Sequence, residues 1–420
     1  MIRTHIIPCA LPREVSDALN LESGRIYSQV LTTHWRVFRH NKHWLSQGGA
    51  EKLNDFLNPE KSLHAHTIDA AQQGFYKAIS VTHALRRAGI DARFPSHRRK
   101  FRTTVWKSTA LKRDGATLIL SNGKGKEKVT FPLPEALQSC LCIREVRLVY
   151  DKCALQYFWH IVAEDGKKPK VPPNNHIVSV DMGEVHPAVV GDGEKATLIT
   201  CRELRSKKQG HARRMASLSS AISRKEKGSN RCRKLIRVKS RMKGKHKRTV
   251  RDMAHKISRA IVDVACEHGA GTIAIGDVRD IADGVSLGKQ TNQKISSWSH
   301  GKIRAYVTYK AETEGMKVVL QNEAHTTQTC PNCGNRHKPR GRDYKCPACA
   351  FQSHRDVVGQ VNILSAYLHG QPGQIKAPQT IKYRIPHNLR VMRRCRDTGQ
   401  ALHEDPLVAR GFPLREAAGL

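Results

Sequence analysis

Acidic and aromatic residues are both scarce in this chain of 420 residues. Asp and Glu number 36 against 73 Lys and Arg, which gives a formal net charge of +37, and Phe, Trp and Tyr make up 5%. The chain lacks an apolar run long enough to span a membrane, an internal repeat, and a signal-peptide layout at its N-terminus. These absences argue against a membrane or secreted protein, and we expect a cytoplasmic one. A chain this basic, with 39% hydrophobic residues, is typical of a folded protein that binds nucleic acid.

The N-terminal region combines one isolated strand with helices. The first ten residues predict a strand that pairs elsewhere in the chain, and the length predicts two to three domains. Between residues 11 and 90 apolar side chains recur at helical spacing, as in Ala71, Phe75 and Ile79. One group of aromatic and basic residues there either faces a nucleic acid or packs inside a small helical bundle: His34, Trp35, Arg36, Arg39, His40, His43 and Trp44.

The rest of the chain changes pattern twice. Residues 96–170 alternate with the period of short strands, and predict a β-barrel-like block that the first strand completes. Residues 165–175, rich in Pro, Lys and Asn, predict a linker. From His176 onward strands alternate with helices, including a helical stretch over 205–268, which is typical of an α/β domain. Residues 371–420 predict a basic, weakly ordered tail.

Four of the twelve cysteines form two CxxC pairs separated by twelve residues: Cys330, Cys333, Cys346 and Cys349. In a reducing compartment this spacing predicts one tetrahedral Zn²⁺ site rather than a redox pair. Because sulfur fills all four positions, the zinc is expected to be structural. The basic residues between the pairs either contact phosphate or form a solvated loop. The other eight cysteines are expected to be small buried side chains.

Positive charge is concentrated between Arg205 and Lys256, where 20 Lys or Arg accompany two acids, Glu226 and Asp252. The stretch contains no aromatic residue, so base stacking is not expected there. Dense basic helices suit contacts to phosphates, which bind without reading sequence and weaken as salt rises.

Three carboxylates stand at the ends of apolar segments in the α/β region. Asp181 follows a buried strand, Glu323 follows another, and Asp356 opens a helix. Together they could hold Mg²⁺ with open positions for a phosphodiester and a water. The pattern alone is weak, since acids often end strands and an acid in the first helical turn also stabilises the helix.

Three segments carry a family signature: SVDMG at 179–183, TTQTCPNCG at 326–334 and HRDVVGQVNIL at 354–364. With weaker matches near 94–103, 120–123 and 145–150, they resemble the TnpB family. These proteins are transposon-encoded RNA-guided DNA endonucleases related to compact type V CRISPR effectors. The resemblance covers roughly residues 85–370.

The resemblance implies a multidomain α+β protein. Residues 1–10 and 96–174 would form a wedge-like β-barrel, interrupted by a helical recognition domain over 11–95. Residues 175–325 and 353–370 would form a RuvC nuclease domain of RNase H-like α/β fold, with a zinc ribbon inserted over 326–352.

The same resemblance implies a guide RNA that pairs with one strand of a double-stranded DNA target while the protein reads a short flanking motif. Two Mg²⁺ ions would support phosphodiester hydrolysis. The family's first acid maps onto Asp181 and its third onto Asp356, but Gly276 stands where the second is expected.

Gly276 leaves the nuclease site open to more than one interpretation. Asp277 is adjacent, but side chains alternate along a strand, so it should point to the other face. Glu323 ends the neighbouring strand, and relatives with Gly at this position support it; we expect Glu323 to replace the missing acid. The alternatives are a surface role for Glu323, a ligand role for Asp277, and a nuclease-inactive repressor. A strand-transferring transposase and a structural RNA-binding protein are weaker alternatives.

Overall fold

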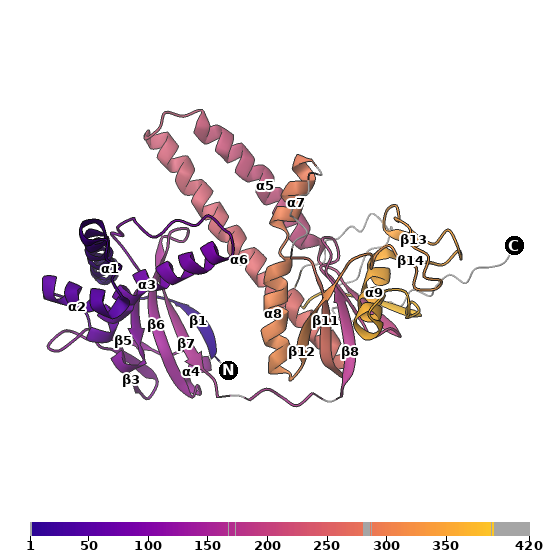
Figure 1. Cartoon of the computed structure of the whole chain (residues 1–420), viewed down its shortest axis with the longest axis horizontal. Helices are drawn as coiled ribbons and strands as arrows, with labels where there is room; N and C mark the ends of the chain where they lie inside the picture. The colour runs from indigo at the N-terminus through magenta and orange to yellow at the C-terminus, as the bar shows by residue number, and fades with distance from the viewer. Residues whose placement is uncertain are drawn as a thin grey trace. The chain divides into compact units, whose positions relative to one another are not determined.

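The computed structural model describes residues 2–166, 168–172, 174–279, 286, 288–387 and 389 (Figure 1). The chain divides into two compact units, Met1–Lys168 and Pro169–Leu420, and the boundary falls within the predicted linker. Among the described residues, no helix is both long enough and apolar enough to cross a membrane.

The first unit combines helices with two antiparallel sheets. The predicted first strand does pair elsewhere, because β1 (Ile2–Pro8) lies antiparallel to β7 (Gln156–Glu164). The other strands are β2 (Thr104–Lys107), β3 (Leu111–Asp114), β4 (Thr117–Leu120), β5 (Val129–Pro132) and β6 (Cys142–Asp151). They form sheets of order β1-β7-β6-β2 and β3-β4-β5, and both sheets contribute to a core that includes Trp106, Leu118 and Trp159.

The helices of the first unit are α1 (Arg13–Asn41), α2 (Gln47–Leu57), α3 (Ala65–Arg87) and the short α4 (Glu135–Gln138). The predicted apolar face of α3 packs against α1, and Phe75 is completely buried. His34 is also completely buried, with its ring against Trp35, Trp44 and Phe75. Packing inside a bundle is therefore the correct interpretation of His34.

The second unit is built on a six-stranded mixed sheet. The strands are β8 (His176–Asp181), β9 (Ala188–Gly191), β10 (Lys195–Ile199), β11 (Ala270–Asp277), β12 (Lys317–Asn322) and β15 (Thr380–Arg384). Their order is β12-β11-β8-β9-β10-β15. β11 is parallel to both β8 and β12, so the carboxyl ends of these three strands lie at the same edge of the sheet.

The helices of the second unit are α5 (Arg202–Ser223), α6 (Asn230–Glu267), α7 (Lys289–Ser297), α8 (His300–Thr313) and α9 (Arg355–His369). Of these, α6, α8 and α9 pack against the sheet. Val178 and Val180 of β8 share a core with α6 and α8, whereas Ser179 between them bonds to α9. Because neighbouring strand residues point to opposite faces, α9 covers one face of β8, and α6 and α8 cover the other.

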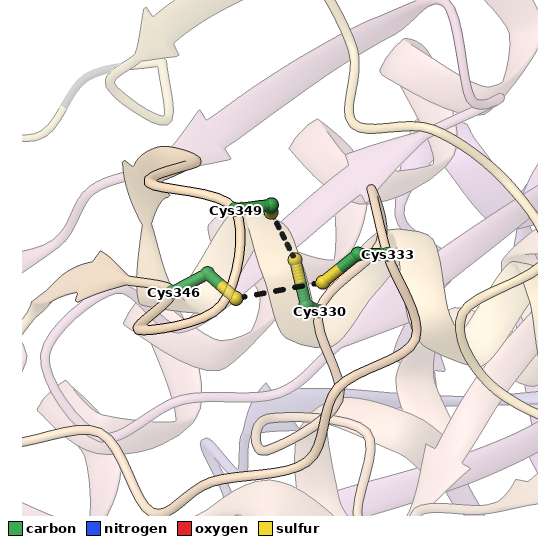
Figure 2. A group of neighbouring side chains, drawn as sticks. All are labelled: Cys330, Cys333, Cys346 and Cys349. Atoms are coloured by element: carbon green, nitrogen blue, oxygen red, sulfur yellow. Dashed lines mark hydrogen bonds between the residues drawn. The ribbon is translucent and has the colours of Figure 1, made fainter.

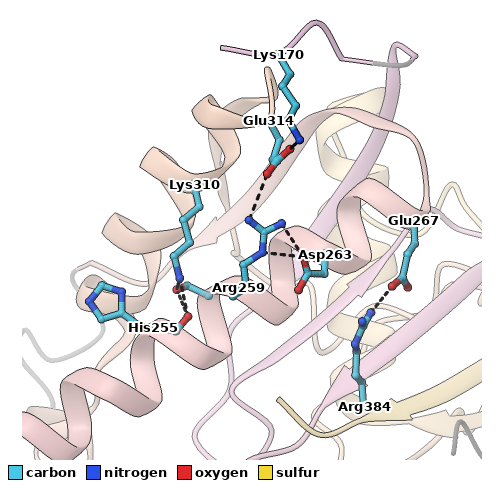
Figure 3. Close-up of polar contacts among 9 residues, drawn as sticks. Lys170, His255, Arg259, Asp263, Glu267, Lys310, Glu314 and Arg384 are labelled. Carbon is cyan, nitrogen blue, oxygen red and sulfur yellow. Dashed lines mark hydrogen bonds and ion pairs between the residues drawn. The ribbon is translucent and has the colours of Figure 1, made fainter. Parts of the chain in front are cut away.

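Charged contacts connect α6 with α8 (Figure 3). Arg259 donates to Asp263 one turn further along α6 and to Glu314 at the end of α8. Lys310 of α8 donates to the carbonyl of His255 at 2.6 Å and to the hydroxyl of Ser258 at 2.8 Å. These contacts align the two helices against the sheet.

One prediction about the second unit is confirmed and another is wrong. The predicted helical stretch over 205–268 consists of α5 and α6, and Gly228 (φ 91°) allows the turn between them. Residues 380–384, predicted as tail, form β15 alongside β10, and Ile381 and Tyr383 pack against buried residues of the sheet. The run is only five residues long, so its alternation is a weak signal. The predicted tail from residue 390 onward lies outside the described residues.

Candidate active site

Asp181 lies at the carboxyl edge of the sheet, on the face that α9 covers. It is two residues beyond Ser179, whose hydroxyl donates to the carbonyl of Gln360 at 2.7 Å, so both side chains point to α9. A β-carbon at Gly359 would lie 2.6 Å from Asp181 Oδ2. Only a residue without a side chain lets the carboxylate approach the helix so closely.

Glu323 lies on the same face, over Gly276. Gly276 pairs with Gln321 in the register of β11 and β12, and Glu323 is two residues beyond Gln321. A β-carbon at Gly276 would lie 1.7 Å from Glu323 Oε1 and 2.6 Å from Glu323 Cγ. The side chain of Glu323 therefore fills the space that a side chain at position 276 would occupy. The segment that follows is held to α9, because the Asn362 amide donates to the carbonyls of Thr326 and Thr329 at 2.7 Å.

Asp277 points to the other face, as strand alternation predicts. Ile273 and Ile275, four and two residues earlier, belong to the core with α6 and α8. The carboxylate of Asp277 accepts a hydrogen bond from Arg279 Nε at 2.9 Å and lies 3.5 Å from Arg304 of α8. The hydrogen bond from Arg279 is the main reason that the pKa of Asp277 is lowered.

The carboxylates destabilise one another in their charged forms. Burial and then the charges of Glu323 and Asp356 raise the pKa of Asp181 well above its ordinary value. Burial, followed by the charge of Asp277, raises the pKa of Glu323 to about 7. Glu323 Oε1 is also buried without a hydrogen-bond partner among the residues that the structure describes, which costs about 1–3 kcal/mol for such a group.

This donor set fits a hard divalent cation. Carboxylate oxygens are the ligands that Mg²⁺ prefers, and a cation would compensate both the crowding of charge and the unpaired oxygen of Glu323. As a set, Asp181, Glu323 and Asp356 are not among the described groups whose ligand atoms all lie within 4.8 Å of one another. Asp356 does belong to such a group, with two histidines.

His186 and His354 beside Asp356 were not singled out by sequence reasoning. His354 is the N-cap of α9, and its Nδ1 accepts a hydrogen bond from the backbone N–H of Asp356 at 3.2 Å. Arg342 Nη1 donates to Asp356 Oδ2 at 3.3 Å. Burial lowers the pKa of both histidines, that of His186 to about 4. His354 lies two residues before Asp356 and could have been predicted from the sequence, whereas nothing in the sequence links His186 to them.

The four clustered cysteines converge as the spacing predicts (Figure 2). Their sulfurs all lie within 4.8 Å of one another, with Cys330 Sγ 3.7 Å from Cys349 Sγ and Cys333 Sγ 3.6 Å from Cys346 Sγ. Four sulfurs bound tetrahedrally at about 2.3 Å from one Zn²⁺ would stand about 3.8 Å apart, so the cluster fits zinc. Gly334 and Ala350, after the two pairs, both have positive φ.

The cysteine cluster is packed against the helix that carries Asp356. Cys330 and Cys346 share a small core with Val358 of α9 and with Tyr344 of β13 (Asp343–Lys345). β14 (Gln352–His354) pairs with β13 and leads directly into α9. Folding of the cluster therefore supports the start of α9.

A basic cavity of about 360 Å³ lies among α5, α6, α7 and α8. Its lining contains one acid, Glu184, and six Lys or Arg: Arg205, Lys208, Lys243, Lys247, Lys294 and Lys302. Burial lowers the pKa of Lys208 to about 8, and Lys302 adds to that effect. The cavity reaches the turn after Asp181, because Trp298 in its lining donates to the carbonyl of Gly183 at 3.2 Å.

The cavity also contains aromatic groups that the composition of the basic stretch did not suggest. His211 and His246, from α5 and α6, stack with ring centroids 3.8 Å apart and planes at 7°. Trp298 comes from the segment between α7 and α8. The cavity thus offers flat rings as well as positive charge.

Comparisons with known proteins match separate parts of the chain. Residues 160–282 match the family model OrfB_IS605, described as "Probable transposase", and residues 300–363 match the model described as "Cas12f1-like, TNB domain". The TnpB-like protein MJ0751 of Methanocaldococcus jannaschii is 28% identical over 205 residues, which cover 47% of this chain and 71% of that protein.

Cas12f1, a CRISPR-associated endodeoxyribonuclease of Sulfoacidibacillus thermotolerans, is 32% identical over 112 residues, or 26% of this chain and only 25% of that protein. Among solved structures, the Cas12f1-sgRNA-target DNA complex matches with a TM-score of 0.59 and 13% identity, over 84% of this chain and 83% of that one. At 13% identity this match shows only that the two chains share a fold, which contains both helices and strands.

Proposed function

The family matches and the curated relatives support a TnpB-family protein, and on this premise we propose that the chain is an RNA-guided DNA endonuclease. A relative is named an endodeoxyribonuclease, and a protein of similar fold was solved with a guide RNA and target DNA. The guide would pair with one strand of the target, and the protein would read a short flanking motif.

The position of Glu323 is the observation that carries the nuclease proposal. A protein that had lost cleavage would have no need to replace a carboxylate missing from position 276. In this chain the carboxylate of Glu323 lies where that side chain would begin. Asp181 and Asp356 complete a set drawn from three segments that are distant in sequence.

Asp181, Glu323 and Asp356 would hold the catalytic Mg²⁺ ions. When bound, two Mg²⁺ ions would activate the attacking water and stabilise the leaving oxygen. The chain's own residues orient this site. Gly276 and Gly359 leave room for the carboxylates of Glu323 and Asp181, and the hydrogen bonds of Asn362 hold the segment that follows Glu323.

The second unit would then be a RuvC-type domain with an inserted zinc ribbon held by Cys330, Cys333, Cys346 and Cys349. In the first unit, the strands would serve as the wedge-like block and α1–α3 as the helical recognition domain. The basic residues of α5 and α6, with the cavity beside them, would bind the phosphate backbone of the guide RNA or the DNA. Their charge suits contacts that do not depend on sequence.

A guided DNA-binding repressor is the second candidate, and the absence of an acid at Gly276 favours it. One preparation separates the two. The full-length protein is expressed with its native flanking DNA, the RNA that copurifies is sequenced, and a plasmid matching that RNA beside a randomised flank is incubated with the protein and Mg²⁺. A discrete RNA with Mg²⁺-dependent cutting supports the nuclease. Guided binding without cutting supports the repressor, and absence of a discrete RNA contradicts both.

A further inference from the structure

A second group of potential metal ligands lies beside the carboxylate set. His186 comes from the connection between β8 and β9, His354 from the end of β14, and Asp356 from the first turn of α9. One ligand atom from each of the three residues lies within 4.8 Å of the other two. The imidazole rings of the two histidines have centroids 5.4 Å apart and planes at 74°.

His186 is the member that packing alone does not explain. The residue is only 5% exposed, and its Nδ1 is buried with no hydrogen-bond partner among the described residues. A buried imidazole nitrogen normally finds a partner, since its interactions with water are lost on folding. An ion held with His354 and Asp356 would provide that partner.

The other two members are held in place by their own contacts. His354 Nδ1 accepts the backbone N–H of Asp356, so in the neutral ring the proton is on Nε2 and a bound ion would take its place. Asp356 receives a hydrogen bond from Arg342. Such contacts orient ligands before the ion arrives, as they do around metal sites in general.

We propose that His186, His354 and Asp356 form a binding site for a divalent transition-metal ion such as Zn²⁺, separate from the cysteine cluster. Two imidazoles and one carboxylate are the donor set that zinc accepts, whereas Mg²⁺ prefers oxygen ligands. The proposal does not depend on nuclease activity. Because Asp356 also belongs to the carboxylate set, an ion held by His186 and His354 would compete for the Asp356 carboxylate with a cation held by Asp181 and Glu323.

The test is the zinc content of the full-length protein with its cysteine cluster already loaded. After equilibrium dialysis against low micromolar free Zn²⁺, wild type should hold two Zn²⁺ per chain, measured by elemental analysis. His186→Gln and His354→Asn should each hold one; Asn still accepts the N–H that caps α9. Asp181→Asn, which alters only the carboxylate set, should keep two. His369→Gln, an exposed histidine of the same helix, is the matched control and should also keep two.

A second measurement needs no variant. In wild type loaded with ¹¹³Cd²⁺, NMR should resolve one signal from a sulfur-ligated ion and one from an ion bound by nitrogen and oxygen. One zinc per chain in wild type, two zincs retained by His186→Gln, or a single sulfur-ligated cadmium signal would each overturn the proposal. Loss of the second zinc from Asp181→Asn as well would move the ion to the carboxylate set, which would also overturn it.

Discussion

Replacing Gly276 by Ala should nearly abolish cleavage while leaving the protein folded. The added β-carbon would lie 1.7 Å from Glu323 Oε1. An ordinary contact needs about 3.4 Å, so the carboxylate has to move by about 1.7 Å, which the end of a flexible side chain can do at little cost to folding. The methyl group enters the face that carries Asp181 and leaves Asp277, on the opposite face, untouched.

The size of the effect follows from that displacement. A misplacement of about 1 Å in a catalytic site can cost roughly 100-fold in rate, or about 2.7 kcal/mol of barrier. We therefore expect Gly276→Ala to lose at least about 100-fold in the cleavage rate. Glu323→Gln, which removes the charge without changing the shape, should fall further, to the level of Asp181→Ala and Asp356→Ala. Asp277→Asn should stay within about tenfold of wild type, which corresponds to roughly 1.4 kcal/mol.

The assay is single-turnover cleavage of a guide-matched plasmid at saturating protein and fixed Mg²⁺. Copurified RNA, target binding and melting temperature are measured on the same preparations, because all three should remain as in wild type in Gly276→Ala. Cleavage within threefold of wild type by Gly276→Ala or Glu323→Gln would refute the placement of Glu323 in the site. A severe loss in Asp277→Asn alone would transfer the role to Asp277.

The remaining predictions concern zinc, salt and pH. Cys346→Ser should lose zinc, unfold the region from Glu323 to Asp356 and abolish cleavage, because metal binding at such sites is coupled to folding; full zinc content with full activity would show that the site is not structural. Four exposed basic residues of α5 and α6 can be changed to Gln together: Arg213, Arg237, Arg241 and Lys245. This variant should bind nucleic acid more weakly, and the slope of log K against log salt should flatten by roughly 0.9 unit per lost phosphate contact. An unchanged slope would mean that this face is only solvated. Lys208→Met should weaken binding yet raise stability near pH 7 by up to about 3 kcal/mol, since folding lowers the pKa of Lys208 to about 8. The folded state then binds this proton less tightly than the unfolded state, so the charge costs stability below pH 8 and the cost fades as the pH rises from 8 toward 10.5; urea unfolding of both proteins at pH 7 and 9.5 should show the difference shrinking, and a destabilised variant at pH 7 would contradict the argument.

Local sequence pattern was enough for many of the elements and for the cysteine cluster. The helical period of Ala71, Phe75 and Ile79 identified the buried face of α3, because side chains three and four apart share one side of a helix. The spacing of Cys330, Cys333, Cys346 and Cys349 was equally informative, since each pair spans a single tight turn. Strand alternation also predicted correctly that Asp277 points away from the face of Gly276.

Contacts between distant segments were decided only by the tertiary structure. The register of β11 against β12 brings Glu323 over Gly276, and no local pattern specifies that register. His186 meets His354 and Asp356 only because the turn after β8 folds back beside the start of α9. β15 was not predicted, because five residues carry little periodic signal. The segment is a strand because it pairs with β10. The sequence thus determined which residues can do chemistry, while the pairing of strands remote in the chain determined which of them meet.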